Sequence, residues 1–267
     1  MITTAEIART AHQTNVGDRV IEKDYVLSWL LVAIAESELS RSLIFKGGTA
    51  LKRVYYPDYR FSEDLDFTLN TDLTHDDLVT AFAALFPELK KRLNLTMSIR
   101  SAEQNVYESS TLLLNHIGPL KARPGARHLK VDITWGELMC YPYQERHLIA
   151  PYSDYPSGVA LYAYSLEEIL IEKLCALIGR TEPRDLYDVY WLLERGNVDL
   201  VFVPANFTAK CQHKGQDPAL MAEALTRKER IFARLWDTRL AVQVSDLPHL
   251  NDVMRVVRRH LRGLGLV

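Results

Sequence analysis

The first strong pattern of apolar and polar positions lies near residue 43, where a strand-like run meets a glycine turn. Residues 43–45 are all apolar, which favours a short buried strand. Gly47, Gly48 and Thr49 follow, and residues 50–55 favour a short helix. Glycines at such a turn let backbone N–H groups approach an anion at the N-terminus of the helix, where the helix dipole favours negative charge. The pattern predicts that these three residues bind phosphate groups.

Residues 64–69 predict a second strand, because polar and apolar side chains alternate along them. The period of two places Asp64 and Asp66 on one face and the apolar side chains on the other. Two neighbouring carboxylates repel each other, whereas a divalent cation such as Mg²⁺ uses them as ligands. Ser62 precedes Asp64 by two residues, so its hydroxyl can reach the same site and contact a nucleotide. Together with the glycine turn, these residues predict a nucleotide-transfer site.

Residues 127–135 show the most regular strand alternation in the chain. Asp132 lies on the polar face, and it becomes a third carboxylate beside Asp64 and Asp66 if the two strands are neighbours in one sheet. In that arrangement Asp132 completes the metal site or orients the acceptor. The alternative is an aspartate that faces solvent, and the residues by themselves leave both open.

The second half of the chain has helical periodicity. Ser165-x-x-Glu168 is a capping box that predicts a helix start, and Lys173 falls within the apolar stripe of that helix. A lysine in such a stripe either reaches water at its edge or meets an anion, such as a triphosphate or the acidic cluster. Asp185 and Asp188 lie one turn apart on the next helix. This pair is either a charged outer face or part of the site.

These patterns predict an α/β fold in two domains. Residues 1–160 are expected to form a mixed sheet flanked by helices, and residues 161–267 a C-terminal helical domain. Further predicted elements are helices at 18–36, 74–92, 218–236 and 247–264 and strands at 95–100 and 107–116. On the first of these helices, Glu22, Lys23 and Asp24 are expected to form a solvated face.

Composition and charge restrict the classes of partner. The chain has 267 residues, of which 48% are hydrophobic and 25% charged, and its net charge is −2. This composition is typical of a globular protein, and the net charge provides no overall attraction to nucleic acid or membrane. Contact with RNA would therefore depend on local basic patches, such as the arginine-rich segments 227–234 and 255–262.

The cysteines and the apolar runs indicate a cytoplasmic protein. Three cysteines without a CxxC pattern favour reduced thiols and argue against a zinc site or a disulfide framework. The longest apolar run, residues 25–35, is far shorter than the roughly 20 residues of a membrane span. No signal peptide precedes it, so no membrane partner is expected.

The glycine turn and the Asp-x-Asp strand carry a resemblance to a known family. FKGGTALKRVYY followed by RFSEDLDFTL, within residues 45–69, resembles the nucleotidyltransferase toxins of the AbiEii/AbiGii type, including the MenT group. The pattern of that family is a Gly-Gly or Gly-Ser turn followed by Asp-x-Asp on a strand. Lys130-x-Asp132 matches its Lys-x-Asp element, and EKLCAL followed by RDLYDVYWLL, within residues 172–193, is similar to its helical elements.

The resemblance implies an Mg²⁺-dependent enzyme with a nucleotidyltransferase-like sheet. It implies catalytic roles for Asp64, Asp66, Lys173 and a downstream aspartate. Asp185 fits best as that aspartate, and Asp188 stays possible because the spacing of these elements varies.

The resemblance also supplies a biological role, the toxin half of a toxin–antitoxin or phage-defence system. The reaction would transfer a nucleoside monophosphate from an NTP to an RNA acceptor. For the MenT-like members this acceptor is the 3′ end of tRNA, so translation is blocked, and the antitoxin is a separate protein. Two alternatives stay open: a nucleotidyltransferase that modifies a protein or a small molecule, and a non-catalytic nucleotide-binding regulator.

Overall fold

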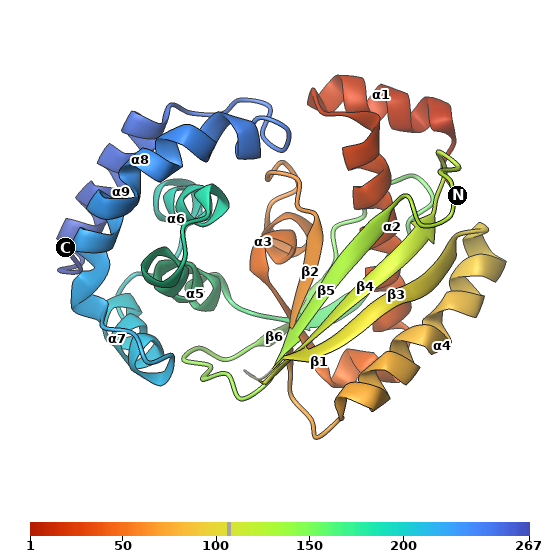
Figure 1. Cartoon of the computed structure of the whole chain (residues 1–267), viewed down its shortest axis with the longest axis horizontal. Helices are drawn as coiled ribbons and strands as arrows, with labels where there is room; N and C mark the ends of the chain where they lie inside the picture. Colours follow the sequence, from red (N-terminus) through yellow and green to blue (C-terminus); the bar gives the residue numbers. More distant parts are fainter. Residues whose placement is uncertain (106–107) are drawn as a thin grey trace. The chain divides into compact units, whose positions relative to one another are not determined.

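One mixed sheet, drawn as arrows in Figure 1, carries the three predicted metal ligands Asp64, Asp66 and Asp132. The computed structural model describes residues 1–105 and 108–267. Within these residues, seven strands pair in the order β3-β4-β5-β2-β1-β7-β6. The strands are β1 (Leu43–Lys46), β2 (Asp64–Leu69), β3 (Thr96–Asn105), β4 (Ser109–Ile117), β5 (His128–Thr134), β6 (Gln144–His147) and β7 (Ala160–Ala163).

The chain divides into two compact units. The sheet unit contains Met1–Glu137 and Tyr143–Ala163, and the helical unit contains Leu138–Pro142 and Tyr164–Val267. The helices of the sheet unit are α1 (Thr4–Thr14), α2 (Asp18–Ala35), α3 (Gly47–Ala50) and α4 (His75–Leu93), with a short 3₁₀-helix η1 (Glu38–Arg41) and a π-helical turn η2 (Leu51–Tyr55) that continues α3. The helices of the helical unit are α5 (Leu166–Gly179), α6 (Pro183–Arg195), α7 (Val203–His213), α8 (Met221–Leu240) and α9 (Leu250–Gly263), with the turn η3 (Pro218–Leu220). The predicted α/β class, a mixed sheet flanked by helices and followed by further helices, is confirmed.

β2 and β5 are neighbours in the sheet and run parallel. Asp64 is the register partner of Lys130, and Asp66 is the partner of Asp132. The apolar side chains of both strands are buried and the aspartates are partly exposed, because successive side chains point to opposite faces. β1 pairs antiparallel with β2, with Lys46 opposite Asp66. The topology therefore places Asp132 beside the Asp-x-Asp strand.

Local sequence explains the start and end of α4. A capping box between Thr74 and Asp77 begins the helix, and Asn94 ends it in the left-handed conformation. Its buried apolar side chains recur at helical spacing, and it contacts β3 and α2. The predicted strand 107–116 begins at Tyr107, outside the described residues, and its described part corresponds to β4.

The expected solvated face on α2 is wrong for Glu22 and Asp24. These side chains are 0% and 4% exposed. Asp24 pairs with Arg53 and accepts a hydrogen bond from the Tyr152 hydroxyl at 2.6 Å. Charges can be buried in this way when each finds a partner. Here the partners come from distant segments, which the local pattern of α2 does not reveal.

A buried ion pair organises the helical unit. Lys210 Nζ lies 2.6 Å from Glu168 Oε1, and both side chains are fully buried. Glu168 Oε2 accepts hydrogen bonds from the backbone N–H groups of Cys140 and Tyr141 at 2.9 and 2.8 Å. Lys210 also donates to the carbonyl oxygen of Leu138 at 2.7 Å. The pair thus binds a short segment near residue 140 to helices that come later in the chain.

α5 begins where the sequence predicts. Ser165 caps it by accepting a hydrogen bond from the N–H of Glu168 at 3.2 Å. The Glu168 carboxylate takes part in the buried ion pair described above, so the predicted capping box is not formed and the cap is the single hydrogen bond that Ser165 accepts. In the part of the chain that the structure describes, no helix combines the length and apolar character needed to cross a membrane.

Candidate active site

Gly47 is the first residue of α3 and lies against Asp66. Its φ of +79° falls in the left-handed region that favours glycine. A Cβ atom at this position would collide with the Asp66 carboxylate, whose Cγ would be 3.0 Å away. The backbone of the turn therefore approaches the second aspartate of the Asp-x-Asp strand closely, which explains the need for glycine.

Gly48 faces a different set of side chains. A Cβ atom there would lie 2.6 Å from Arg60 Nη2 and 3.5 Å from Ser62 Oγ. Arg60 is 4% exposed and donates through Nη1 to the carbonyl oxygen of Phe61 at 3.2 Å. A carboxylate lies on one side of the glycine turn, and a guanidinium and a hydroxyl lie on the other. The Ser62 hydroxyl is a donor suited to bind a phosphate, and the buried Arg60 guanidinium adds positive charge beside it.

Thr49 ties the turn to the neighbouring strand. Its hydroxyl donates to the carbonyl oxygen of Asp64 at 2.5 Å, and its side chain is 2% exposed. Among the described residues, no side chain caps the N-terminus of α3. The predicted contact of Thr49 with phosphate would therefore be made by backbone N–H groups, because the hydroxyl already holds β2.

Asp132 is held by two neighbours. Its Oδ1 accepts a hydrogen bond from the Thr111 hydroxyl at 2.7 Å, and its Oδ2 lies 2.6 Å from Lys130 Nζ. Burial lowers the pKa of Lys130, but the hydrogen bond to Asp132 and the charges of Asp132, Asp64 and Asp66 raise it above its usual value overall. Lys130 is therefore a stable positive charge that interacts with all three carboxylates.

The three carboxylates are not assembled as a metal cluster. Among residues 1–105 and 108–267, no group of three His, Cys, Asp or Glu side chains is arranged to hold a metal ion. Asp64 and Asp66 still provide the hard oxygen ligands that Mg²⁺ prefers, and Mg²⁺ is commonly bound by one or two carboxylates, waters and substrate phosphates. The donor set thus fits Mg²⁺ that binds together with a nucleotide.

Lys173 in α5 binds both candidate aspartates of α6. Its Nζ lies 2.9 Å from Asp185 Oδ1 and 2.7 Å from Asp188 Oδ2, and both carboxylates are buried. Arg180 Nε also contacts Asp185, at 2.7 Å. Burial raises the pKa of Asp185, but Lys173 and Arg180 lower it below its usual value overall. The aspartate pair is therefore not an outer charged face, and both members hold Lys173.

The two arginine-rich segments are largely engaged within the helical unit. Lys228 is 5% exposed and donates to three backbone carbonyl oxygens at the end of α5, those of Leu177, Ile178 and Arg180. This part of the predicted RNA-binding cluster is wrong, because a buried ammonium group is not available to an RNA phosphate. Arg258 and Arg259 pair with carboxylates, each at 2.9 Å.

Sequence reasoning missed Lys46, which directly precedes the glycine turn. Its side chain is 7% exposed, its Nζ donates to Thr134 Oγ1 at 2.7 Å and it lies 3.4 Å from Glu137 Oε1. Its position next to Gly47 could have indicated Lys46 from the sequence alone. No sequence pattern indicates Thr111, because its contact with Asp132 depends on the pairing of β4 with β5.

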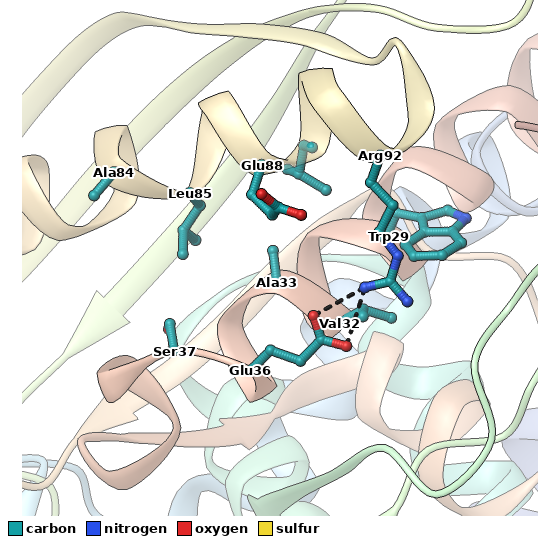
Figure 2. Close-up of a pocket in the computed structure, with 10 residues that line it drawn as sticks. Trp29, Val32, Ala33, Glu36, Ser37, Ala84, Leu85, Glu88 and Arg92 are labelled. Carbon is teal, nitrogen blue, oxygen red and sulfur yellow. Dashed lines mark hydrogen bonds and ion pairs between the residues drawn. The ribbon is translucent and has the colours of Figure 1, made fainter.

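Figure 2 shows a pocket between α2 and α4 that is distinct from these residues. Trp29 lines it, and the Arg92 guanidinium lies 4.8 Å from the centre of the Trp29 ring. Arg92 also donates to both oxygens of Glu36, at 3.1 and 2.9 Å. None of the predicted site residues, all of which the structure describes, lines this pocket. We therefore place the candidate active site at the glycine turn and not here.

The chain is similar to solved structures along nearly its whole length. MenT4, a nucleotidyltransferase toxin from Mycobacterium tuberculosis H37Rv, matches with a TM-score of 0.74 and 18% identity over 99% of this chain and 90% of that chain. JHP933 from Helicobacter pylori matches with a TM-score of 0.57 and 15% identity over 93% of each chain. At these identities the likeness shows a shared fold. No curated protein matches the sequence.

The fold is thus of the nucleotidyltransferase type. A family model described as the nucleotidyl transferase AbiEii toxin of type IV toxin–antitoxin systems matches residues 29–259. The chain belongs to this family of nucleotidyltransferase toxins. Membership confirms the resemblance carried by the glycine turn and the Asp-x-Asp strand, and it implies an NTP substrate and an antitoxin partner.

Proposed function

We propose that this toxin transfers a nucleoside monophosphate from an NTP to the 3′ end of tRNA in the presence of Mg²⁺, and thereby blocks translation in the cytoplasm. One observation carries the proposal: the Gly47 turn contacts Asp66, which shares a strand face with Asp64. This contact joins a turn suited to phosphates with two metal ligands. Family membership supports the transfer reaction, and the resemblance to the MenT group supports the tRNA acceptor.

In the proposed reaction, a 3′-hydroxyl oxygen of the RNA attacks the α-phosphorus of the NTP. The bond from that phosphorus to the bridging oxygen breaks, pyrophosphate leaves, and the proton of the hydroxyl passes to water. Mg²⁺, held by Asp64 and Asp66, would supply positive charge beside the phosphates and stabilise the transition state. Asp132 and Lys130 are proposed to orient the acceptor hydroxyl, because their ion pair lies beside Asp64 and Asp66.

The phosphates of the NTP require further positive partners. We assign the backbone N–H groups of Gly47, Gly48 and Thr49 and the hydroxyl of Ser62 to their binding. Lys173 is proposed to neutralise them. Asp185 and Asp188 are then positioning residues, because both hold the Lys173 ammonium group.

The test is a transfer assay with Mg²⁺, total tRNA and each α-labelled NTP in turn. Label is expected on tRNA with a preferred NTP, and it should disappear in the Asp64→Ala/Asp66→Ala protein and when EDTA removes the metal. Label on a protein or a small molecule would show that the acceptor belongs to that class and is not tRNA. Binding of NTP without any labelled acceptor would instead indicate a nucleotide-binding regulator.

A further inference from the structure

A second pocket in the sheet unit is strongly basic. It has a volume of about 570 Å³ and is lined by α2, the end of β4, the loop before β5 and the residue that precedes Asp64. Its charged and titratable lining residues are Arg19, Lys23, Glu63, His116, Arg123, Arg127 and His128. We call these seven residues the basic pocket.

Positive charge exceeds negative charge in the basic pocket. Lys23 pairs with Glu63 at 3.3 Å, and Arg127 pairs with the buried Glu22 behind it. Arg19 and Arg123 are exposed, and within the described part of the chain no carboxylate pairs with either. Burial and the charge of Arg19 lower the pKa of Arg127, so like charges lie close together. Such an arrangement favours an anionic ligand.

His116 provides independent support for a ligand. It lines the pocket, is 2% exposed, and its Nδ1 has no hydrogen-bond partner among the described residues. Burial, together with the positive charges of Lys23 and His128, lowers its pKa to about 4, so the ring is neutral at pH 7. A buried polar atom without a partner is costly unless a ligand or water satisfies it.

The location connects this pocket to the candidate active site. Glu63 directly precedes Asp64, and His128, which also lines the pocket, shares the polar face of β5 with Lys130 and Asp132. His128 and Asp132 are four residues apart on the strand, which corresponds to roughly 13 Å. An anion in the pocket is therefore separate from a phosphate held at the glycine turn, yet close enough to belong to the second substrate.

We propose that the basic pocket binds a backbone phosphate of the acceptor RNA, upstream of the reacting 3′ end. This inference rests on the proposed function, since it assigns the pocket to the acceptor of that reaction. Arg19 and Arg123 supply the charge-assisted hydrogen bonds, and His116 adds a hydrogen bond from within. A phosphate interaction of this kind carries no sequence information but sets the register of the RNA strand.

The test compares Arg19→Ala/Arg123→Ala with Arg9→Ala/Arg41→Ala, which removes the same charge outside the pocket. Binding of labelled total tRNA is measured without NTP between about 50 and 200 mM salt. The pocket variant is expected to bind at least about tenfold more weakly. The slope of log K against log salt concentration should also be smaller by about one for each phosphate that the variant no longer neutralises. The control variant should bind tRNA as the wild-type protein does, and the KM for NTP should be unchanged in both variants.

Other outcomes overturn the proposal in distinguishable ways. Unchanged RNA binding, or equal weakening in both variants, removes the assignment of the pocket to RNA. A raised KM for NTP with normal RNA binding assigns the pocket to the nucleotide. If the wild-type protein binds tRNA through Arg19 and Arg123 but transfers nothing, the proposed reaction fails while the pocket assignment stands. If it neither binds nor transfers, both fail.

Discussion

At the scale of single residues, the site depends on how closely the backbone of the glycine turn approaches Asp66. Gly47 combines a positive φ with a carboxylate at contact distance, so two separate constraints exclude a side chain there. Gly158 has a similar φ of +76°, but a Cβ atom there would meet nothing within 4 Å. A comparison of alanine variants at Gly47 and Gly158 therefore separates the effect of backbone strain from the effect on the site.

We predict that Gly47→Ala lowers the transfer rate by about 100-fold, because the added methyl group displaces the Asp66 carboxylate, and displacements near 1 Å can cost that much. Both Gly47→Ala and Gly158→Ala should lower the free energy of unfolding by about 1–2 kcal/mol, because alanine is strained in the left-handed backbone conformation. Gly158→Ala should nevertheless keep its activity. Single-turnover rates and urea unfolding of both variants provide the comparison. Equal activity in the two variants would contradict the role assigned to the close approach of Gly47 and Asp66.

At the scale of elements, buried charges join helices that the sequence pattern treats separately. Lys173 links α5 to α6 through Asp185 and Asp188, and Lys210 links α7 to α5 through Glu168. Removing one partner of a buried pair leaves an unpaired charge, which costs more than the pair itself contributes.

Lys210→Met is therefore expected to lower the free energy of unfolding by about 3–5 kcal/mol. Arg234→Met, on the exposed face of α8, is the control and should change it by less than about 0.5 kcal/mol. The double variant Lys210→Met/Glu168→Gln should recover part of the loss, because no buried charge remains. Urea unfolding measures all three, and a small effect of Lys210→Met would show that the site relaxes or admits water.

At the scale of the whole molecule, the helical unit includes a segment that precedes the last two strands. Leu138–Pro142 belongs to this unit although Tyr143–Ala163 belongs to the sheet unit. The segment provides the N–H groups that bind Glu168 and the carbonyl oxygen that binds Lys210. A cut at residue 164 would therefore remove ligands of a buried ion pair.

We predict that a fragment of residues 164–267 unfolds with a free energy at least about 2 kcal/mol lower than a fragment of residues 138–267, because hydrogen bonds to charged groups contribute about 1.5–3 kcal/mol each. Urea unfolding followed by circular dichroism compares the two. Identical transitions would show that the short segment adds nothing to the stability of the helices.

Features that depend on local periodicity can be read from the amino-acid sequence alone. The alternation at 64–69 and 127–135 defined which side chains share a face, and the family and the fold class predicted from these motifs are confirmed. The helix start at Ser165 followed from a cap residue, and the helix from Thr74 followed from its apolar periodicity. Such signals act over a few residues, so they are readable without knowledge of the rest of the chain.

Which charged side chains pair with each other depends on the tertiary fold. The burial of Glu22 and Asp24, the engagement of Lys228, and the two aspartates on Lys173 all contradict or complete what local patterns indicated. Cys175 and Cys211, 36 positions apart, bring their sulfur atoms to 3.4 Å in the same way. The physical reason is that the free energy of a charged or polar side chain depends on its burial and its partners, and these come from segments that the fold, not the local sequence, brings together.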